Sequence, residues 1–185
     1  MVYVKKSTCR MIFILSLLLL CFKLPLHAQR MAVKTNTIGW LTASPNIETE
    51  FILGRHFSLD ASIAGNPIRT DKFRTTFFHV QPEIRYWLNR PLVSHFFGLT
   101  AFSNSYNILI DDVYRKGDAF AGGVTYGYDW VLNRHWNIEA TIGVGVLRYR
   151  QFKYDKGTAK PATPNDSKTT FAPIKLGISI AYVFH

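Results

Sequence analysis

The sequence predicts an all-β protein, an eight-stranded antiparallel up-and-down transmembrane β-barrel with short periplasmic turns and longer external loops. Three features predict this fold class. Apolar and polar residues alternate over many segments, three short turns share one signature, and longer polar stretches connect the remaining segments. The length of 185 residues favours a single domain of this kind.

The N-terminus has the composition of a secretory signal. Basic residues precede an apolar run over 11–22, and a short segment ending at Ala28 follows it, which is the tripartite order of such signals. The apolar run is shorter than the about 20 residues that a transmembrane helix needs. We therefore predict a signal peptide over 1–28 and the barrel domain over 29–185. The alternative is a lipoprotein signal with Cys21 acylated, which the large Leu20 disfavours.

The chain is basic, with 22 lysines and arginines against 12 aspartates and glutamates. Four of the basic residues belong to the predicted signal, namely Lys5, Lys6, Arg10 and Lys23. The mature chain therefore keeps 18 basic residues and a formal charge of +6. Both cysteines, Cys9 and Cys21, also lie in the signal. The segment 29–185 thus offers no disulfide and no cysteine metal site.

Three turns of one kind recur along the chain. They read "LGRHF" from Leu53, "LNRPL" from Leu88 and "LNRHW" from Leu132, and an alternating pattern precedes and follows each. Glycine and asparagine tolerate the positive φ that tight hairpin turns demand. The three segments are therefore predicted to be tight hairpin turns.

The other connections are polar and rich in Gly, Pro, Asn and Asp, as loops are. They cover 42–46, 65–75, 103–118 and 151–169. Together with the turns they separate eight strands, which we place at 31–41, 46–53, 57–65, 75–88, 94–103, 119–132, 136–150 and 170–185. With an even number of strands, the three turns and both chain ends fall on one side of the barrel. Bacterial outer-membrane barrels have this asymmetry, with the tight turns in the periplasm.

The volume of the side chains decides which face of the strands lies inside. A soluble lipid-carrying barrel would keep its apolar face inward, but an eight-stranded barrel has an interior only just wide enough for side chains to fill. One face of the predicted strands is bulky and apolar, including Phe57, Leu59, Val124, Tyr126, Ile142, Val146, Ile174, Leu176 and Ile178. The opposite face is mostly small. We therefore predict that the bulky face lies in lipid and the small face lines the lumen.

The segment "VQPEIRYWL" over 80–88 then directs Glu83 and Arg85 into the lumen. We predict an ion-pair network there, formed by Asp60, Glu83, Arg85, Asp129, Glu139 and Lys175, together with Glu48 or Glu50. Buried charges must be paired, because an unmatched buried ion is costly. Glu83 and Glu139 could alternatively act as a general acid and base, but a structural network that stiffens the barrel is the favoured interpretation.

The aromatic residues bear on the orientation of the barrel. Trp130 and Trp136 flank one tight turn and suit an aromatic girdle at the periplasmic interface. Trp87 is predicted to point inward by strict alternation, unless a bulge near Pro82 turns it outward. The last segment, "GISIAYVFH", resembles the aromatic-terminated strand that the outer-membrane assembly machinery recognises, although His185 follows the final aromatic residue.

The chain also resembles a known family. The most specific segments are Pro82 to Trp87, and Gly127 to Trp130 with Trp136 to Glu139, within a likeness that runs from Val33 to Phe184. Through them the chain resembles the outer-membrane family catalogued as domain of unknown function 3575. The resemblance implies a small outer-membrane barrel of Bacteroidetes-type bacteria, sometimes associated with fimbrial or surface-adhesin gene clusters. It implies no catalytic residue.

Enzymatic and metal sites find little support in the sequence. His56, His95, His135 and His185 are predicted to lie near the periplasmic rim, but no pair has helical ligand spacing. An outer-membrane lipid hydrolase would need a histidine beside a serine, for which His79 with Ser103 or Ser105 is the nominal candidate. We expect no enzyme activity, no catalytic residue, no metal and no cofactor.

The predicted external loops carry the basic excess. A basic loop surface is formed by Arg69, Lys72, Arg74, Lys153, Lys156 and Lys160. Such a surface would attract lipopolysaccharide phosphates or an acidic partner, or it would simply be a solvated loop surface. Glycines over 122–145 are assigned to lumen space, because no helix follows them as a phosphate-binding loop requires.

These observations favour an integral outer-membrane protein of a Gram-negative bacterium with a non-catalytic structural, adhesive or surface-assembly role. The expected partners are outer-membrane lipid and lipopolysaccharide, the outer-membrane assembly machinery, and surface-adhesin or fimbrial proteins, with no nucleic acid. A narrow pore is the alternative, although a filled lumen should conduct little. An outer-membrane lipid hydrolase and a soluble lipid carrier are further alternatives.

Overall fold

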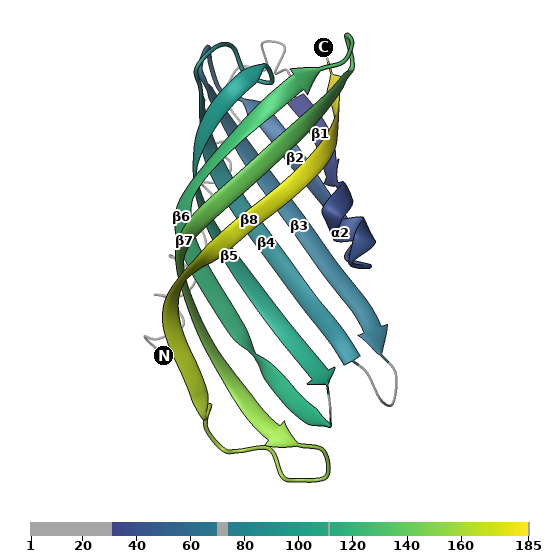
Figure 1. The fold of residues 1–185 in the computed structure, drawn as a ribbon, viewed down its shortest axis with the longest axis vertical. Helices are drawn as coiled ribbons and strands as arrows, with labels where there is room; N and C mark the ends of the chain where they lie inside the picture. Colours follow the sequence, from purple (N-terminus) through teal and green to yellow (C-terminus); the bar gives the residue numbers. More distant parts are fainter. Residues whose placement is uncertain (1–30, 70–73, 111, 185) are drawn as a thin grey trace, which may run out of the picture.

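The protein folds into one closed barrel of eight antiparallel strands in the order of the sequence (Figure 1). A computed structural model describes residues 31–69, 74–110 and 112–184; the predicted signal peptide lies outside the described residues. The elements are β1 (Met31–Asn36), α2 (Thr37–Leu41), β2 (Asn46–Ile52), β3 (Phe57–Arg69), β4 (Arg74–Trp87), β5 (Ser94–Ile110), β6 (Val113–Val131), β7 (Trp136–Asp155) and β8 (Asp166–Phe184). The predicted all-β class and up-and-down topology are confirmed.

The two ends of the barrel differ in their connections. The terminal end, where β1 begins and β8 ends, carries the three predicted turns at 53–56, 88–93 and 132–135. The far end carries α2 and the connections at 42–45, 70–73, 111–112 and 156–165. Closure comes from β1, which pairs with β2 on one side and with β8 on the other. Every strand therefore has a neighbour on both sides at the terminal end.

The polar segments at the far end are largely strand rather than loop. The β5 and β6 ladder continues without a register shift as far as Ile110 and Val113, and β7 reaches Asp155. The predicted loops over 65–75, 103–118 and 151–169 were thus too long. The residues of these segments that belong to β3 to β8 complete the antiparallel hydrogen-bond ladder, and polar side chains carry no penalty on a strand face that is exposed.

The predicted strand over 31–41 was also too long, since β1 ends at Asn36 and the one-turn helix α2 follows. Asn36 ends the strand by capping this helix, and its side-chain oxygen accepts a hydrogen bond from the Ile38 amide at 3.0 Å. Asparagine is among the preferred N-cap residues. Alternation over 31–41 did not reveal this local competition between strand and cap.

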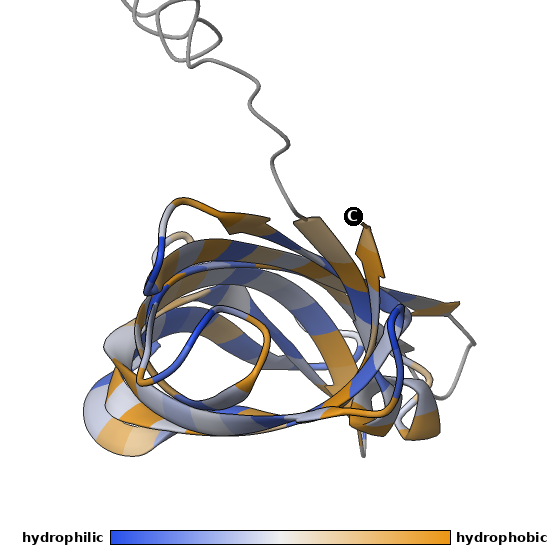
Figure 2. Ribbon diagram, turned by 90° about the horizontal axis from the view of Figure 1, so that it is seen from above, coloured by the Kyte–Doolittle hydropathy of each residue, from blue (hydrophilic) through white to orange (hydrophobic). Residues whose placement is uncertain are grey.

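The bulky face of the strands points outward, as predicted. Val124 is 57% exposed and Ile142 is 54% exposed, whereas Asp60 and Glu139 on the opposite face are buried. Figure 2, which looks along the barrel, shows hydrophobic and hydrophilic residues alternating along the strands. This orientation is the reverse of the one that the lipid-carrier alternative requires.

One residue predicted to point outward is buried. Ile174 is only 8% exposed, because a β-bulge interrupts the pairing of β7 with β8. Gly143 pairs with Lys175 while Val144 pairs with Pro173, which leaves Ile174 without a register partner. An extra residue in one strand reverses the facing of the residues beyond it. The prediction for Ile174 was wrong because alternation assumes an unbroken ladder.

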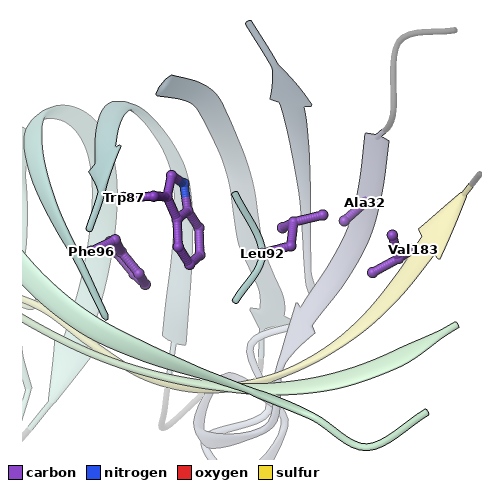
Figure 3. Close-up of a cluster of buried hydrophobic side chains, with 5 residues drawn as sticks. All are labelled: Ala32, Trp87, Leu92, Phe96 and Val183. Carbon is purple, nitrogen blue, oxygen red and sulfur yellow. The ribbon is translucent and has the colours of Figure 1, made fainter. Parts of the chain in front are cut away.

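An apolar cluster closes the lumen at the terminal end. It consists of Ala32, Trp87, Leu92, Phe96 and Val183, all of which are buried (Figure 3). Leu92 comes from the connection at 88–93 and adopts a positive φ of 63°. The carbonyl oxygen of Leu92 accepts a hydrogen bond from the Asn137 side chain at 2.9 Å, which holds this connection over the lumen.

Trp87 points inward, as strict alternation predicted. It is fully buried, and its indole nitrogen donates a hydrogen bond to the Ser58 hydroxyl at 2.7 Å. The register of β4 with β5 is the same on both sides of Pro82, so the alternative of a bulge there is excluded. Within the described residues, no helix is long and apolar enough to cross a membrane.

Candidate functional site

The centre of the lumen is filled by charged side chains that converge from six strands. Inward-facing positions on β1, β2, β3, β4, β7 and β8 supply Lys34, Glu50, Asp60, Glu83, Arg85, Glu139 and Lys175. We call these seven residues the lumen network. Their side chains are at most 6% exposed, so each charge is compensated by protein rather than by bulk water.

Arg85 is the hub of the lumen network. Its Nη1 lies 2.8 Å from Glu50 and 2.8 Å from Glu139, and its Nε lies 3.0 Å from Glu83. The guanidinium also lies over the Phe96 ring, 4.3 Å from the ring centroid. A planar group with five donors suits this position, because it can serve several carboxylates at once.

Two lysines on the neighbouring strands β1 and β8 complete the lumen network. Lys34 contacts Glu50 at 2.6 Å, Glu139 at 2.9 Å and Asp60 at 3.0 Å. Lys175 contacts Glu83 at 2.7 Å and Asp60 at 3.5 Å. Each carboxylate of the network therefore contacts at least two cations or receives further hydrogen bonds, which is the condition under which buried ion pairs are tolerated.

Neighbouring small residues make room for these contacts. Thr125 donates a hydrogen bond to Glu83 at 2.8 Å, and Thr141 donates one to Glu139 at 2.8 Å. At Gly98 on β5, a Cβ atom would collide with the Glu83 carboxylate and the Thr125 hydroxyl. The small lumen face noted in the sequence is thus what allows the charged residues to fill the centre.

The structure brings together five of the six predicted network residues: Asp60, Glu83, Arg85, Glu139 and Lys175. Of the two candidates on β2, Glu50 joins them and Glu48 does not. Lys34 belongs to the lumen network but was not predicted. Its position two residues after the inward-facing Ala32 is the signal that would have found it, because alternate residues of a strand share a face.

Asp129 was assigned to the network incorrectly. It is buried in the lumen, but neither of its carboxylate oxygens has a hydrogen-bond partner among the described residues. Its cross-strand neighbours are Ser94 on β5 and Glu139 on β7, neither of which is a cation. The lumen cations Lys34 and Arg85 contact Glu139 instead, so the short Asp129 side chain remains outside the network.

The residues of the predicted basic loop surface, expected in and beside the connections at 65–75 and 151–169, lie partly on strands. Arg69 and Arg74 end β3 and begin β4, directly opposite each other in the ladder, and Lys72 lies outside the described residues. Lys153 is exposed on β7, Lys156 forms an exposed ion pair with Asp112 at 3.6 Å, and Lys160 lies 3.9 Å from the centroid of the Phe152 ring.

The histidines of the turns serve structural contacts. The Nδ1 atom of His56 lies 3.0 Å from the Trp87 carbonyl oxygen, and that of His95 lies 2.7 Å from the Tyr126 hydroxyl. His135 stacks on Tyr182, and His185 lies outside the described residues. Within the part of the chain that the structure describes, no group of three or more potential ligands could hold a metal ion.

His79 and the two candidate serines lie on opposite faces of the barrel wall. His79 is half-buried and its Nε2 lies 3.3 Å from Gln81. Ser103 and Ser105 are exposed on the outer face of β5, and Ser105 donates its hydroxyl hydrogen to Asp118. The structure therefore does not bring Ser103 or Ser105 and His79 into the arrangement that a nucleophile and its base require.

The three repeated turns place one arginine each around the mouth of the terminal end. Arg55, Arg90 and Arg134 line a cavity of about 620 Å³ whose walls include Ile52, Leu92 and Val183. All three arginines are exposed. The repeated turns thus place a ring of positive charge around the mouth. The prediction of three tight turns did not include this ring.

A protein-family model described as "Protein of unknown function (DUF3575)" matches residues 12–184. The match includes all eight strands and every residue of the lumen network. No curated protein matches the chain.

Proposed function

We propose that this chain, which belongs to the DUF3575 family of proteins of unknown function, is an integral outer-membrane protein of a Gram-negative bacterium with a non-catalytic structural or surface-assembly role. The proposal includes export by a signal peptide over 1–28 and insertion by the outer-membrane assembly machinery. The observation that carries it is the combination of an apolar outer surface with a charged, filled lumen.

The height of the apolar surface fits a bilayer. On β6, the outward residues from Trp130 to Phe120 are aromatic or aliphatic, apart from Gly122, for which the predicted place in the lumen was wrong, and Asp118 follows them. This segment has about ten residues, and a strand rises about 3.4 Å per residue. With a strand tilt of about 40°, the segment spans about 26 Å along the barrel axis. Known outer-membrane barrels have an apolar band about 25 Å tall. Water would be an unfavourable solvent for so large a continuous apolar surface.

Aromatic side chains border this band at the terminal end. Tyr182 packs edge-on against both Trp136 and Phe184, while Tyr128 packs against Trp130. On β3 to β6, Tyr86 packs against Phe57 and Tyr126 against Phe97. Aromatic girdles of this kind lie at membrane interfaces, and we assign this one to the periplasmic interface.

Exposed basic residues border the band at the far end. On β7, Arg148 and Arg150 follow the exposed Val146 on the same outward face. In the proposed orientation they lie at the level of the phosphates of lipopolysaccharide. Arginine binds phosphate through paired, charge-assisted hydrogen bonds. This placement supports lipopolysaccharide as a partner of the outer surface.

The strands β5 to β8 supply the surface for a protein partner. They reach furthest at the far end, where β6, β7 and β8 extend beyond the rest of the barrel (Figure 1). Tyr114 and Tyr154 stack on this extension with their ring centroids 5.2 Å apart. We propose that this ordered polar sheet, rather than long loops, contacts surface-adhesin or fimbrial proteins, as expected for bacteria of the Bacteroidetes type.

Membrane fractionation tests the location. The full-length protein expressed in its natural host should fractionate with the outer membrane and resist extraction by sodium carbonate. Recovery in the water-soluble periplasmic fraction would overturn the proposal.

Conductance and lipid analysis test the role. In planar bilayers the refolded protein should show no steady openings, because the lumen network fills the barrel; steady openings would favour the narrow pore instead. Replacement of His79 by alanine should leave the mass of lipid A unchanged. A change in that mass would favour the lipid hydrolase.

Binding to lipopolysaccharide can be tested with paired variants. Replacing Arg148 and Arg150 together by glutamine should reduce the amount of lipopolysaccharide that copurifies with the protein, because two phosphate ligands are lost. Replacing Lys153 and Lys160 by glutamine removes the same charge from residues that do not border the apolar band on the outer face. Equal effects of the two pairs would contradict a specific contact.

A further inference from the structure

A second cavity opens at the far end, apart from the mouth of the terminal end. It has a volume of about 300 Å³ and is lined by α2 and by residues of β1, β2, β3, β4 and β8. Its lining includes Asn36, Asn46, Glu48, His79, Ile174 and Lys175. Figure 1 shows α2 beside β1 and β2, which are the shortest strands of the barrel wall.

The polar groups at the rim of this cavity form hydrogen bonds with one another. Asn46 accepts from the Asn36 amide at 2.6 Å and donates to the Asn36 carbonyl oxygen at 2.9 Å. The Asn36 side chain donates in turn to the Leu176 carbonyl oxygen on β8 at 3.1 Å. A Cβ atom at Gly39 would collide with the Asn46 side chain. The rim is therefore closely fitted, and its polar groups are already in use.

The polar groups deeper in the cavity are also engaged, with one exception. His79 lies within hydrogen-bonding distance of Gln81, at 3.3 Å, and Lys175 contacts Glu83 at 2.7 Å. Glu48 is only 4% exposed, and its Oε2 atom has no hydrogen-bond partner among the described residues. A buried carboxyl oxygen without a hydrogen-bond partner is costly, so this atom is open to a ligand.

The charge balance of the lumen points to the kind of ligand. Six carboxylates are buried there, namely Glu48, Glu50, Asp60, Glu83, Asp129 and Glu139. Three cations face them, namely Lys34, Arg85 and Lys175. Among the described residues of the lumen, buried carboxyl groups thus outnumber cationic groups two to one. A positively charged ligand at Glu48 would reduce this excess.

We propose that the cavity binds a small organic cation whose ammonium group donates a hydrogen bond to Glu48 Oε2. A divalent metal ion is a poorer match, because it needs about six oxygen ligands and the cavity offers one free carboxylate. The cavity walls include Ile38, Phe77 and Ile174, which can contact a short hydrocarbon chain. The site depends on the lumen geometry alone, so it does not rest on the proposed surface role.

Calorimetric titration of the refolded full-length mature protein with n-hexylammonium tests the inference, using detergent without protein as the blank. The wild type should bind one equivalent. Glu48→Gln keeps the shape of the side chain and removes its charge, so binding should weaken at least tenfold. Asp129→Asn removes the other unpaired carboxylate, which is not part of this cavity, and should change the dissociation constant less than twofold.

Uncharged and anionic probes separate the contribution of charge from that of the hydrocarbon chain. Neither n-hexanol nor hexanoate should bind with comparable affinity, because neither carries a cationic donor. Absence of hexylammonium binding to the wild type, or equal binding by the wild type and Glu48→Gln, would overturn the proposal. Urea unfolding of Glu48→Gln should show a cooperative transition; if it does not, Gly39→Ala, which displaces Asn46 at the rim, replaces it as the test variant.

Discussion

The two faces of the barrel wall are built on the same strands, but they are specified in different ways. On the outer face, Val124 and Ile142 need only be large and apolar, and other hydrophobic residue types at these positions would serve equally well. On the inner face, Arg85 makes contacts of 2.8–3.0 Å with three different glutamates. The outer face therefore requires only apolar residues, whereas the inner face requires particular residues that match their contact partners.

Removing the hub of the lumen network should give the largest effect. Arg85→Met leaves Glu50, Glu83 and Glu139 without their shared cation, and breaking a buried ion pair in this way costs about 3–5 kcal/mol. The free energy of unfolding, measured by urea denaturation of the refolded protein in lipid vesicles, should fall by that amount. Arg148→Met on the outer surface is the matched control. A loss equal to that of the control would mean that the network contributes little.

A charge on the outer face should give the next largest effect, and only in lipid. Ile142 lies midway along the apolar band of β7, where an arginine is expected to cost about 2–4 kcal/mol. Phe120→Arg, at the edge of the band, should cost about 1 kcal/mol or less. Unfolding from lipid vesicles measures both. Equal costs at the two positions would break the contrast between the middle and the edge.

The buried indole should have a smaller effect. Trp87→Phe removes the hydrogen bond to Ser58 but keeps an aromatic ring against Phe96. A hydrogen bond contributes about 1 kcal/mol, so the free energy of unfolding should fall by about that much. Trp130→Phe on the outer face, where no hydrogen bond is lost within the described contacts, should change it less. The reverse order would argue against Trp87 as an internal contact.

The ion pair between Lys156 and Asp112 should matter least. Its charged atoms lie 3.6 Å apart in exposed side chains, and such pairs are worth about 0.5 kcal/mol because water and salt screen them. Lys156→Ala should leave the urea midpoint almost unchanged. A loss of unfolding free energy as large as that of Trp87→Phe would show that this exposed ion pair stabilises the barrel as much as a buried contact does.

Local patterns predicted the turns and the facing of most strands. The three turns at 53–56, 88–93 and 132–135 lie where the repeated motif placed them, although Gly54, Asn89 and Asn133 do not adopt the positive φ that the prediction invoked. The inward position of Glu83 and Arg85 followed from alternation, because side chains of a strand point to opposite faces in turn. Both inferences need only neighbours in sequence, which is why they were confirmed.

Predictions failed where the same local sequence pattern was compatible with two structures. The bulge at Ile174 and the helix cap at Asn36 each interrupt a strand whose alternation looked continuous. Polar strand extensions such as 103–110 were taken for loops, because only the partner strand shows that their ladder continues. In each case the deciding hydrogen bonds come from residues that are distant in sequence or compete locally with the strand.

The sequence by itself determined the number of strands, the position of the turns and the face that carries the charges, since these follow from a two-residue period and from a repeated turn motif. Only the tertiary structure decided which charges meet. Lys34 and Glu139 lie 2.9 Å apart although more than half of the chain separates them, and Asp129, adjacent to Glu139 in the ladder, has no partner among the described residues. Closure of the barrel creates these contacts, because it brings the first strand against the last and directs all inward side chains to one axis.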